Sequence, residues 1–104
     1  MPPDPNHPMA RKVLYVERKG KECQITLDTE TDTALGFKND DMYFLHKTGS
    51  GENHFYVANT VELDGKSYVE IQARPKEAIL QIVAALPRGQ QTREFRTRFG
   101  RREL

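Results

Sequence analysis

Two short segments near the N-terminus are rich in apolar and β-branched residues, as β-strands are. They span residues 13–16 and 23–27 and are separated by Glu17-Arg18-Lys19-Gly20-Lys21. Pairing Glu17 with Lys21 sets Tyr15 opposite Cys23 and Val13 opposite Ile25, so that the apolar side chains share one face. We therefore expect a hairpin with a three-residue loop, 18–20, whose glycine takes the left-handed position.

The same turn spacing returns in Glu62-Leu63-Asp64-Gly65-Lys66. It predicts a second hairpin of strands 54–62 and 66–72, with Val57 opposite Ile71 and Asn59 opposite Val69. The recurrence fits a duplicated hairpin. We favour instead two unrelated hairpins that use the same turn with a Glu–Lys pair across it.

The segment between the hairpins is less regular. Residues 28–41 are polar and rich in threonine, which indicates a loop or a short helical turn anchored by Leu35 and Phe37. Residues 42–46 form a continuous apolar run of strand length, and the glycine-rich residues 47–53 form a turn.

A helix is predicted over residues 75–86. Pro75 suits a first helical turn, and Pro87 and Gly89 end the segment. Its apolar side chains recur at helical spacing and should dock on the sheet: Ile79, Leu80, Ile82, Val83 and Leu86.

The predicted fold class is α+β: a mainly antiparallel sheet of four or five strands, with one C-terminal helix packed on one face. The other face would be free, with Tyr43, Tyr56 and Tyr68 as stacking platforms. We expect a disordered proline-rich leader (1–10), a single domain (11–87) and an arginine-rich C-terminal arm (88–104). Met9 is a second candidate start site beside Met1.

The net charge is only +1, but it is unevenly distributed. Residues 11–22 carry a net charge of +3, residues 23–73 have three lysines against nine acids, and residues 88–104 have six arginines against two acids. Basic flanks around an acidic middle point to an anionic partner for the flanks.

The arm carries no lysine, and Phe95 and Phe99 lie between its arginines. Guanidinium groups grip phosphate with paired donors, and aromatic rings stack on unpaired bases. We therefore predict a small non-enzymatic protein that contacts RNA, single-stranded DNA or another polyanion. The expected anion-binding residues lie in the arm and at a basic end of the first hairpin: Arg88, Arg93, Phe95, Arg96, Arg98, Phe99, Arg101, Arg102, Arg11, Lys12, Arg18, Lys19 and Lys21.

Two alternatives stay open. The first alternative concerns the arm: it is a solvated tail, or a short second helix whose two phenylalanines dock back on the domain. The second alternative concerns the function: the protein is a protein–protein interaction module, such as a small regulator or inhibitor. The charge asymmetry fits self-association equally well.

Catalytic and metal motifs are weak. His46 and His54 flank the glycine-rich turn and should lie near each other, but a zinc site needs three or four ligands. Cys23 is expected to be a buried core thiol, and residues 28–32 a solvated acidic loop. Gly49-Ser50-Gly51 lacks the lysine of a phosphate-binding loop. We predict no enzyme activity, cofactor or metal; a small enzyme built around His46, His54 and Cys23 is a further alternative.

The location is also predicted from composition. One cysteine cannot form an intramolecular disulfide, and no apolar run is long enough to span a bilayer. We expect a cytoplasmic protein without a membrane partner.

Overall fold

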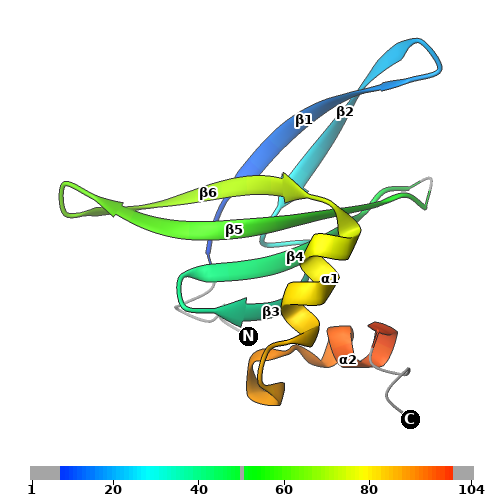
Figure 1. The fold of residues 1–104 in the computed structure, drawn as a ribbon. Helices are drawn as coiled ribbons and strands as arrows, with labels where there is room; N and C mark the ends of the chain where they lie inside the picture. Colours follow the sequence, from blue (N-terminus) through cyan, green and yellow to red (C-terminus); the bar gives the residue numbers. More distant parts are fainter. Residues whose placement is uncertain (1–7, 50, 100–104) are drawn as a thin grey trace.

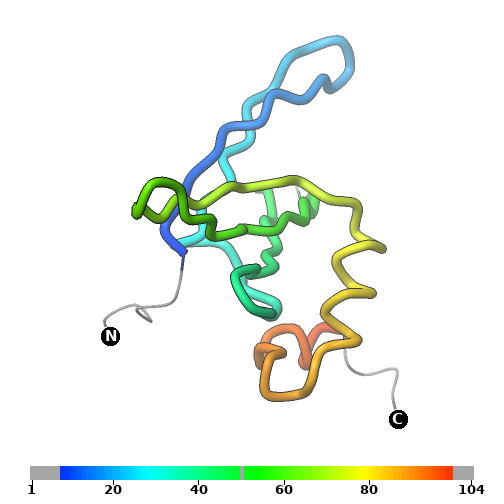
Figure 2. Tube along the Cα trace, turned by 60° about the vertical axis from the view of Figure 1, so that its left-hand side comes forward, coloured from blue at the N-terminus to red at the C-terminus, as the bar shows by residue number. Residues whose placement is uncertain are grey.

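The computed structural model describes residues 8–49 and 51–99. It is α+β, with six strands in two antiparallel sheets followed by a helical region, as Figures 1 and 2 show. The elements are β1 (Arg11–Arg18), β2 (Lys21–Asp28), β3 (Thr33–Lys38), β4 (Asp41–Lys47), β5 (Asn53–Leu63), β6 (Lys66–Arg74), α1 (Lys76–Ala84), the 3-10 turn η1 (Arg88–Gln90) and α2 (Arg93–Phe99). The predicted α+β class with antiparallel strands is thereby confirmed, but the strands form two sheets rather than the expected single sheet of four or five strands.

The larger sheet has the order β3-β4-β5-β6, and the smaller one is the β1–β2 hairpin. Consecutive residues are buried in β4, at 43–45, and in β5, at 55–58. A strand with one wet face would alternate instead, so these continuous apolar runs reflect a sheet that is covered on both sides.

One face of the larger sheet packs against the helices. Ile79, Val83 and Leu86 are buried there against Leu35 and Phe55, and Leu80 is partly buried. Ile82 was expected in the same apolar stripe, but it is 40% exposed because it lies on the side of α1 away from the sheet.

The opposite face packs against the β1–β2 hairpin, so the prediction of a free sheet face was wrong. Ile25 and Leu27 of β2 are buried against Phe44 and Tyr56. Of the three proposed stacking tyrosines, Tyr43 and Tyr56 belong to the two cores, and only Tyr68, at 49% exposed, is accessible.

Both hairpin turns are one residue shorter than predicted. Arg18 pairs with Lys21 and Leu63 with Lys66, which leaves the two-residue loops 19–20 and 64–65. Both loop residues have positive φ in each turn, which is the type I′ pattern and fits the right-handed twist of the strands.

The new register changes which side chains face the core. Leu14 pairs with Ile25 and Val16 with Cys23, whereas Tyr15 points outward and is 61% exposed. In the second hairpin Ala58, not Val57, lies opposite Ile71. The expected cross-turn Glu–Lys pairing is therefore absent from both hairpins, while the hairpins themselves, including a fourth strand over 54–62, are confirmed.

Strand β3 occupies part of the segment that was predicted as a loop. Its pairing with β4 shifts between Ala34 and Gly36, and this irregularity obscures the alternation in the sequence. Leu35 is fully buried as expected, but Phe37 is 41% exposed.

The C-terminal region folds back onto β3 rather than forming a separate arm. Gln91 bridges to Gly36, and helix α2 packs beside β3 with Phe95 buried in the helix-side core. Residues 100–104, and the leader residues 1–7, lie outside the described part of the chain. Pro8 and Ala10, also assigned to the leader, are hydrogen-bonded to Thr29.

Candidate anion-binding surface

Four arginines lie along η1 and α2. Arg88, Arg93 and Arg98 are exposed and Arg96 is half-buried. No carboxylate among the described residues comes within 4.0 Å of any of their guanidinium groups. By contrast, Arg11 lies 3.2 Å from Asp28, and Arg18 contacts Glu52. No described carboxylate therefore neutralises these four cations, and Arg96 donates a hydrogen bond of 3.4 Å to the Arg88 carbonyl.

The segment that carries them is held firmly to the domain. The Gln91 side chain donates to the carbonyl of Val83 at 2.9 Å and to that of Leu86 at 3.3 Å, at the C-terminal end of α1. The Thr92 hydroxyl donates to the Ala34 carbonyl at 2.6 Å. These bonds pair backbone carbonyl groups that have no partner within a helix end or an edge strand, and they fix α2 to β3.

Phe95 and Phe99 both contribute to this attachment. Phe95 is 4% exposed, and the Phe99 ring packs against it at a centroid distance of 5.6 Å. Phe99 also meets Phe55 of the sheet, at 6.4 Å. Their four-residue spacing thus marks an apolar helix face, as in the second-helix alternative, and Phe95 is removed from the expected binding set.

A hollow of about 310 Å³ lies on α2 and is lined by Arg93, Glu94, Thr97 and Arg98. Arg93 and Thr97 are four residues apart, as are Glu94 and Arg98, so the lining comes from one side of the helix. A phosphate group in this hollow would meet two guanidinium groups and a hydroxyl. The Glu94 carboxylate would repel the phosphate, which limits the affinity of the hollow for anions.

The basic residues of the first hairpin do not form the single patch that was predicted. Arg18, Lys19 and Lys21 lie at its turn, whereas Arg11 and Lys12 lie at the other end of β1. The Lys12 ammonium donates to the Ile71 carbonyl at 3.0 Å. In both Figures 1 and 2 the hairpin turn and α2 lie at opposite ends of the molecule, so the two basic regions are separate surfaces. Arg101 and Arg102 lie outside the described residues.

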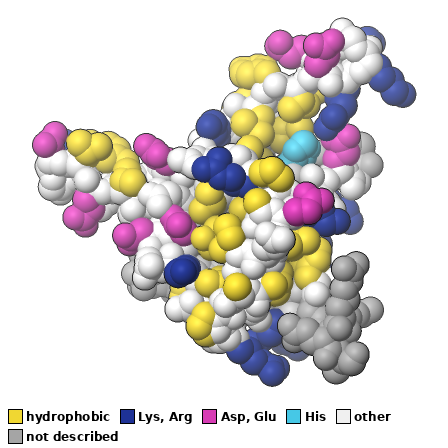
Figure 3. Space-filling view, in the orientation of Figure 1, with side chains coloured by type: hydrophobic (Ala, Val, Ile, Leu, Met, Phe, Trp, Pro, Cys, Tyr) yellow, Lys and Arg dark blue, Asp and Glu magenta, His cyan; other side chains and the backbone are white. Residues whose placement is uncertain are grey.

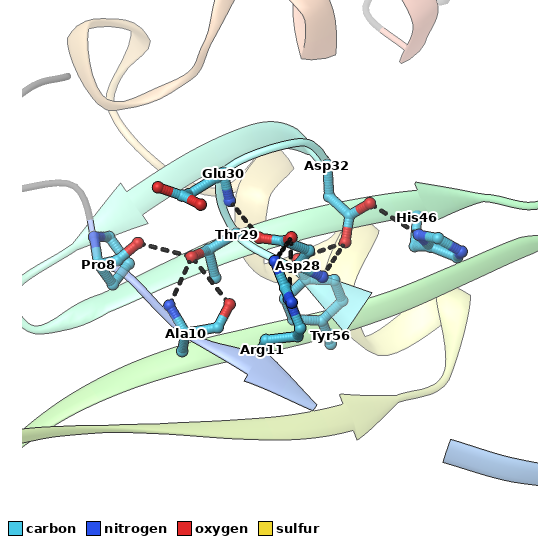
Figure 4. A network of polar contacts seen from close by, with 9 residues as sticks. All are labelled: Pro8, Ala10, Arg11, Asp28, Thr29, Glu30, Asp32, His46 and Tyr56. Atoms are coloured by element: carbon cyan, nitrogen blue, oxygen red, sulfur yellow. Dashed lines mark hydrogen bonds and ion pairs between the residues drawn. The ribbon is translucent and has the colours of Figure 1, made fainter. Parts of the chain in front are cut away.

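Asp32 is the polar group that sequence reasoning missed. It was expected in a solvated loop, but its side chain is 6% exposed and binds across to the sheet (Figure 4). It accepts hydrogen bonds from the Tyr56 hydroxyl at 2.7 Å and from the Asp28 amide at 2.8 Å, and His46 Nδ1 lies at 2.7 Å. A histidine and a tyrosine on the inner face of apolar strands need a buried hydrogen-bond partner. Their presence in these strands is the one signal in the sequence that indicates such a partner.

This network fastens the connection between the two sheets. Burial, together with the neighbouring Asp32 carboxylate, raises the pKa of Tyr56 well above its usual value, so the phenol stays protonated and donates. Thr29 beside it is fully buried, and its hydroxyl donates to the Pro8 carbonyl at 2.7 Å. The arrangement is typical of a structural connection.

His46 and His54 are direct cross-strand partners, with ring centroids 6.3 Å apart. Nε2 of His54 is buried and lies 3.6 Å from a Glu52 oxygen, without a hydrogen-bond partner in the described structure. Within residues 8–49 and 51–99, no group of three His, Cys, Asp or Glu side chains is placed to hold a metal ion.

Cys23 is exposed, which corrects the prediction of a buried thiol. The two-residue turn places it opposite Val16, towards the outer end of the β1–β2 hairpin.

Comparisons with known proteins give no assignment: no family model, curated protein or solved structure matches this chain. Among the described residues, no helix is both long enough and apolar enough to cross a membrane.

Proposed function

We propose that this protein is a non-enzymatic binding protein that contacts a single-stranded nucleic acid through the arginines of η1 and α2. The observation that carries the proposal is the absence of any described carboxylate within 4.0 Å of Arg88, Arg93, Arg96 and Arg98. Four like charges within eleven residues repel one another, and an anionic partner relieves that repulsion.

The rigid attachment of the segment supports the proposal. Because Thr92 and Phe95 hold α2 on the sheet, the arginines are placed before the partner arrives. Less conformational entropy is then lost on binding than for a disordered tail. Arginine suits this role because its planar fork of donors matches the oxygens of a phosphate.

Phosphate contacts dominate affinity in this proposal, with little base stacking. Phe95 is buried and Phe99 is packed against it, so contacts with phosphate oxygens provide most of the binding energy. We therefore expect weak discrimination between RNA and single-stranded DNA, and among sequences. The basic turn of β1–β2 is a separate surface that only a long strand would reach together with α2. The single cysteine supports a reducing, cytoplasmic setting.

The test is a titration of the full chain against labelled single-stranded RNA and DNA at several salt concentrations. For single strands the logarithm of the binding constant falls with that of the salt concentration by about 0.7 for each phosphate contacted. We expect a slope of about −2 to −3 for three to four arginine contacts. Absence of binding at low salt would contradict the proposal.

A further inference from the structure

The outer end of the β5–β6 hairpin extends past the rest of the sheet. Strand β4 pairs with β5 only from Lys47 to Asp41, which lies opposite Asn59. Strand β5 continues to Leu63 and pairs there with β6 alone. Figure 1 shows this end of the hairpin projecting away from the helices, so no described helix covers it.

One face of this projection carries exposed apolar side chains. Phe55 and Val57 belong to the helix-side core, so Val61 and Leu63 point to that same side by the alternation of the strand. Tyr68 lies directly opposite Val61. Leu63 is 59% and Tyr68 49% exposed, and Figure 3 shows hydrophobic and acidic side chains together at the surface of this end.

Two opposite charges frame the apolar residues on the same face. Lys66 lies opposite Leu63 at the outer end, and Glu70 lies opposite Asn59 at the inner end. Each is two residues from Tyr68 along β6, and both are exposed. Neither forms an ion pair with a described residue.

This order of charges is complementary to itself. If a two-fold axis passes beside Tyr68 and two such faces meet, Lys66 of each copy lies against Glu70 of the other. Leu63 of each copy lies against Asn59, and Tyr68 and Val61 meet their own equivalents. A two-fold interface uses the same patch on both subunits, which this arrangement requires.

We propose that this face binds a second copy of the chain and forms a symmetric dimer. The patch has six side chains on each copy: Asn59, Val61, Leu63, Lys66, Tyr68 and Glu70. Standard interfaces use about 20–30 residues on each side, so this dimer is weak and forms only at high protein concentration. The inference goes beyond the proposed function, because no arginine of η1 or α2 belongs to this face.

The experiment is sedimentation velocity of the full chain over a range of protein concentrations. The native protein should shift from monomer towards dimer as its concentration rises. Lys66→Glu and Glu70→Lys should each remove this shift, because each places like charges together at both ends of the interface. An equimolar mixture of the two variants should restore the dimer, because both charge pairs in the mixed dimer are then opposite.

Glu62→Lys is the matched control. Glu62 lies on the same hairpin but on its other face, opposite Ser67, so this substitution changes the charge equally and should leave the dimer intact. Circular dichroism of each variant establishes that the exposed substitutions preserve the fold. A native protein that stays monomeric at all concentrations, or a mixture that fails to recover the dimer, would overturn the proposal.

Discussion

The amide of Thr92 donates a hydrogen bond of 2.9 Å to the carbonyl of Leu35, and so joins the arginine-bearing segment to the edge strand β3. The hydroxyl of the same residue lies 2.6 Å from the Ala34 carbonyl and accepts from the Phe95 amide at 3.2 Å. Thr92 therefore caps the N-terminus of α2 and also attaches α2 to the sheet through hydrogen bonds.

Thr92→Val should weaken this attachment. It removes the cap and the bond to Ala34 while keeping the shape of the side chain, and we expect the free energy of unfolding to fall by about 1–2 kcal/mol. Urea denaturation measures this loss. Thr92→Ser retains the hydroxyl and should keep most of the stability. Equal losses for the two variants would show that the hydroxyl does not attach α2 to the sheet.

Gly36 is required where β3 passes under the C-terminal region. A Cβ atom there would lie 2.9 Å from the Gln90 carbonyl oxygen and 3.0 Å from a Val83 methyl carbon. Since these groups belong to the packed helix side, we expect Gly36→Ala to cost about 1–3 kcal/mol. Gly89→Ala meets nothing within 4 Å and should change stability by less than about 0.5 kcal/mol. Thermal unfolding of both variants measures these losses. Similar losses for the two variants would show that the packing around Gly36 does not require glycine.

The Asp32–Tyr56 bond should show strong energetic coupling. Asp32→Ala leaves the buried Tyr56 hydroxyl without its acceptor, and we expect a loss of about 2–3 kcal/mol. In the Tyr56→Phe background this unpaired hydroxyl is absent. Adding Asp32→Ala should therefore lower the free energy of unfolding by less than it does in the native chain. A double-mutant cycle by urea denaturation measures this, and strictly additive losses would show that the two groups do not interact.

Stability should also fall at high pH. Burial and Asp32 raise the pKa of Tyr56, and burial and Asp41 raise that of Tyr43, so each phenol keeps its proton to a higher pH in the folded chain than in the unfolded chain. Above about pH 10 the unfolded chain releases these protons, and stability then falls as pH rises, by up to about 1.4 kcal/mol per pH unit for each group. Denaturation between about pH 9 and pH 11 should show a shallower decline for Tyr56→Phe than for the native chain. An unchanged decline would contradict the role of Tyr56.

Much of the fold could be predicted because its signals are local. The apolar run 42–46, the helix after Pro75 and the glycine turns all lie where the sequence indicates. The hairpin register was wrong because parity was argued from Val13 and Tyr15, whose exposure shows that they face solvent. Asp64-Gly65 is itself a strong type I′ signal and gives the correct register.

The features that could not be predicted depend on distant contacts. Nothing in residues 28–32 distinguishes Asp32 from its acidic neighbours until β4 and β5 bring His46 and Tyr56 to it. Likewise, Phe95 and Phe99 fit a nucleic-acid contact and an apolar helix face equally well. Only the position of α2 on β3 decides between them.

Removal of charge at matched positions shows whether the arginines of α2 contact the partner. Arg93→Gln/Arg98→Gln and Lys38→Gln/Lys47→Gln each remove two positive charges from exposed positions, the first pair on α2 and the second on the sheet. In titrations of labelled single-stranded RNA, the arginine variant should bind more weakly, with a salt dependence shallower by about 1.4 in slope. The lysine variant should bind like the native chain. Equal binding by both variants, or equal losses in both, would contradict the account.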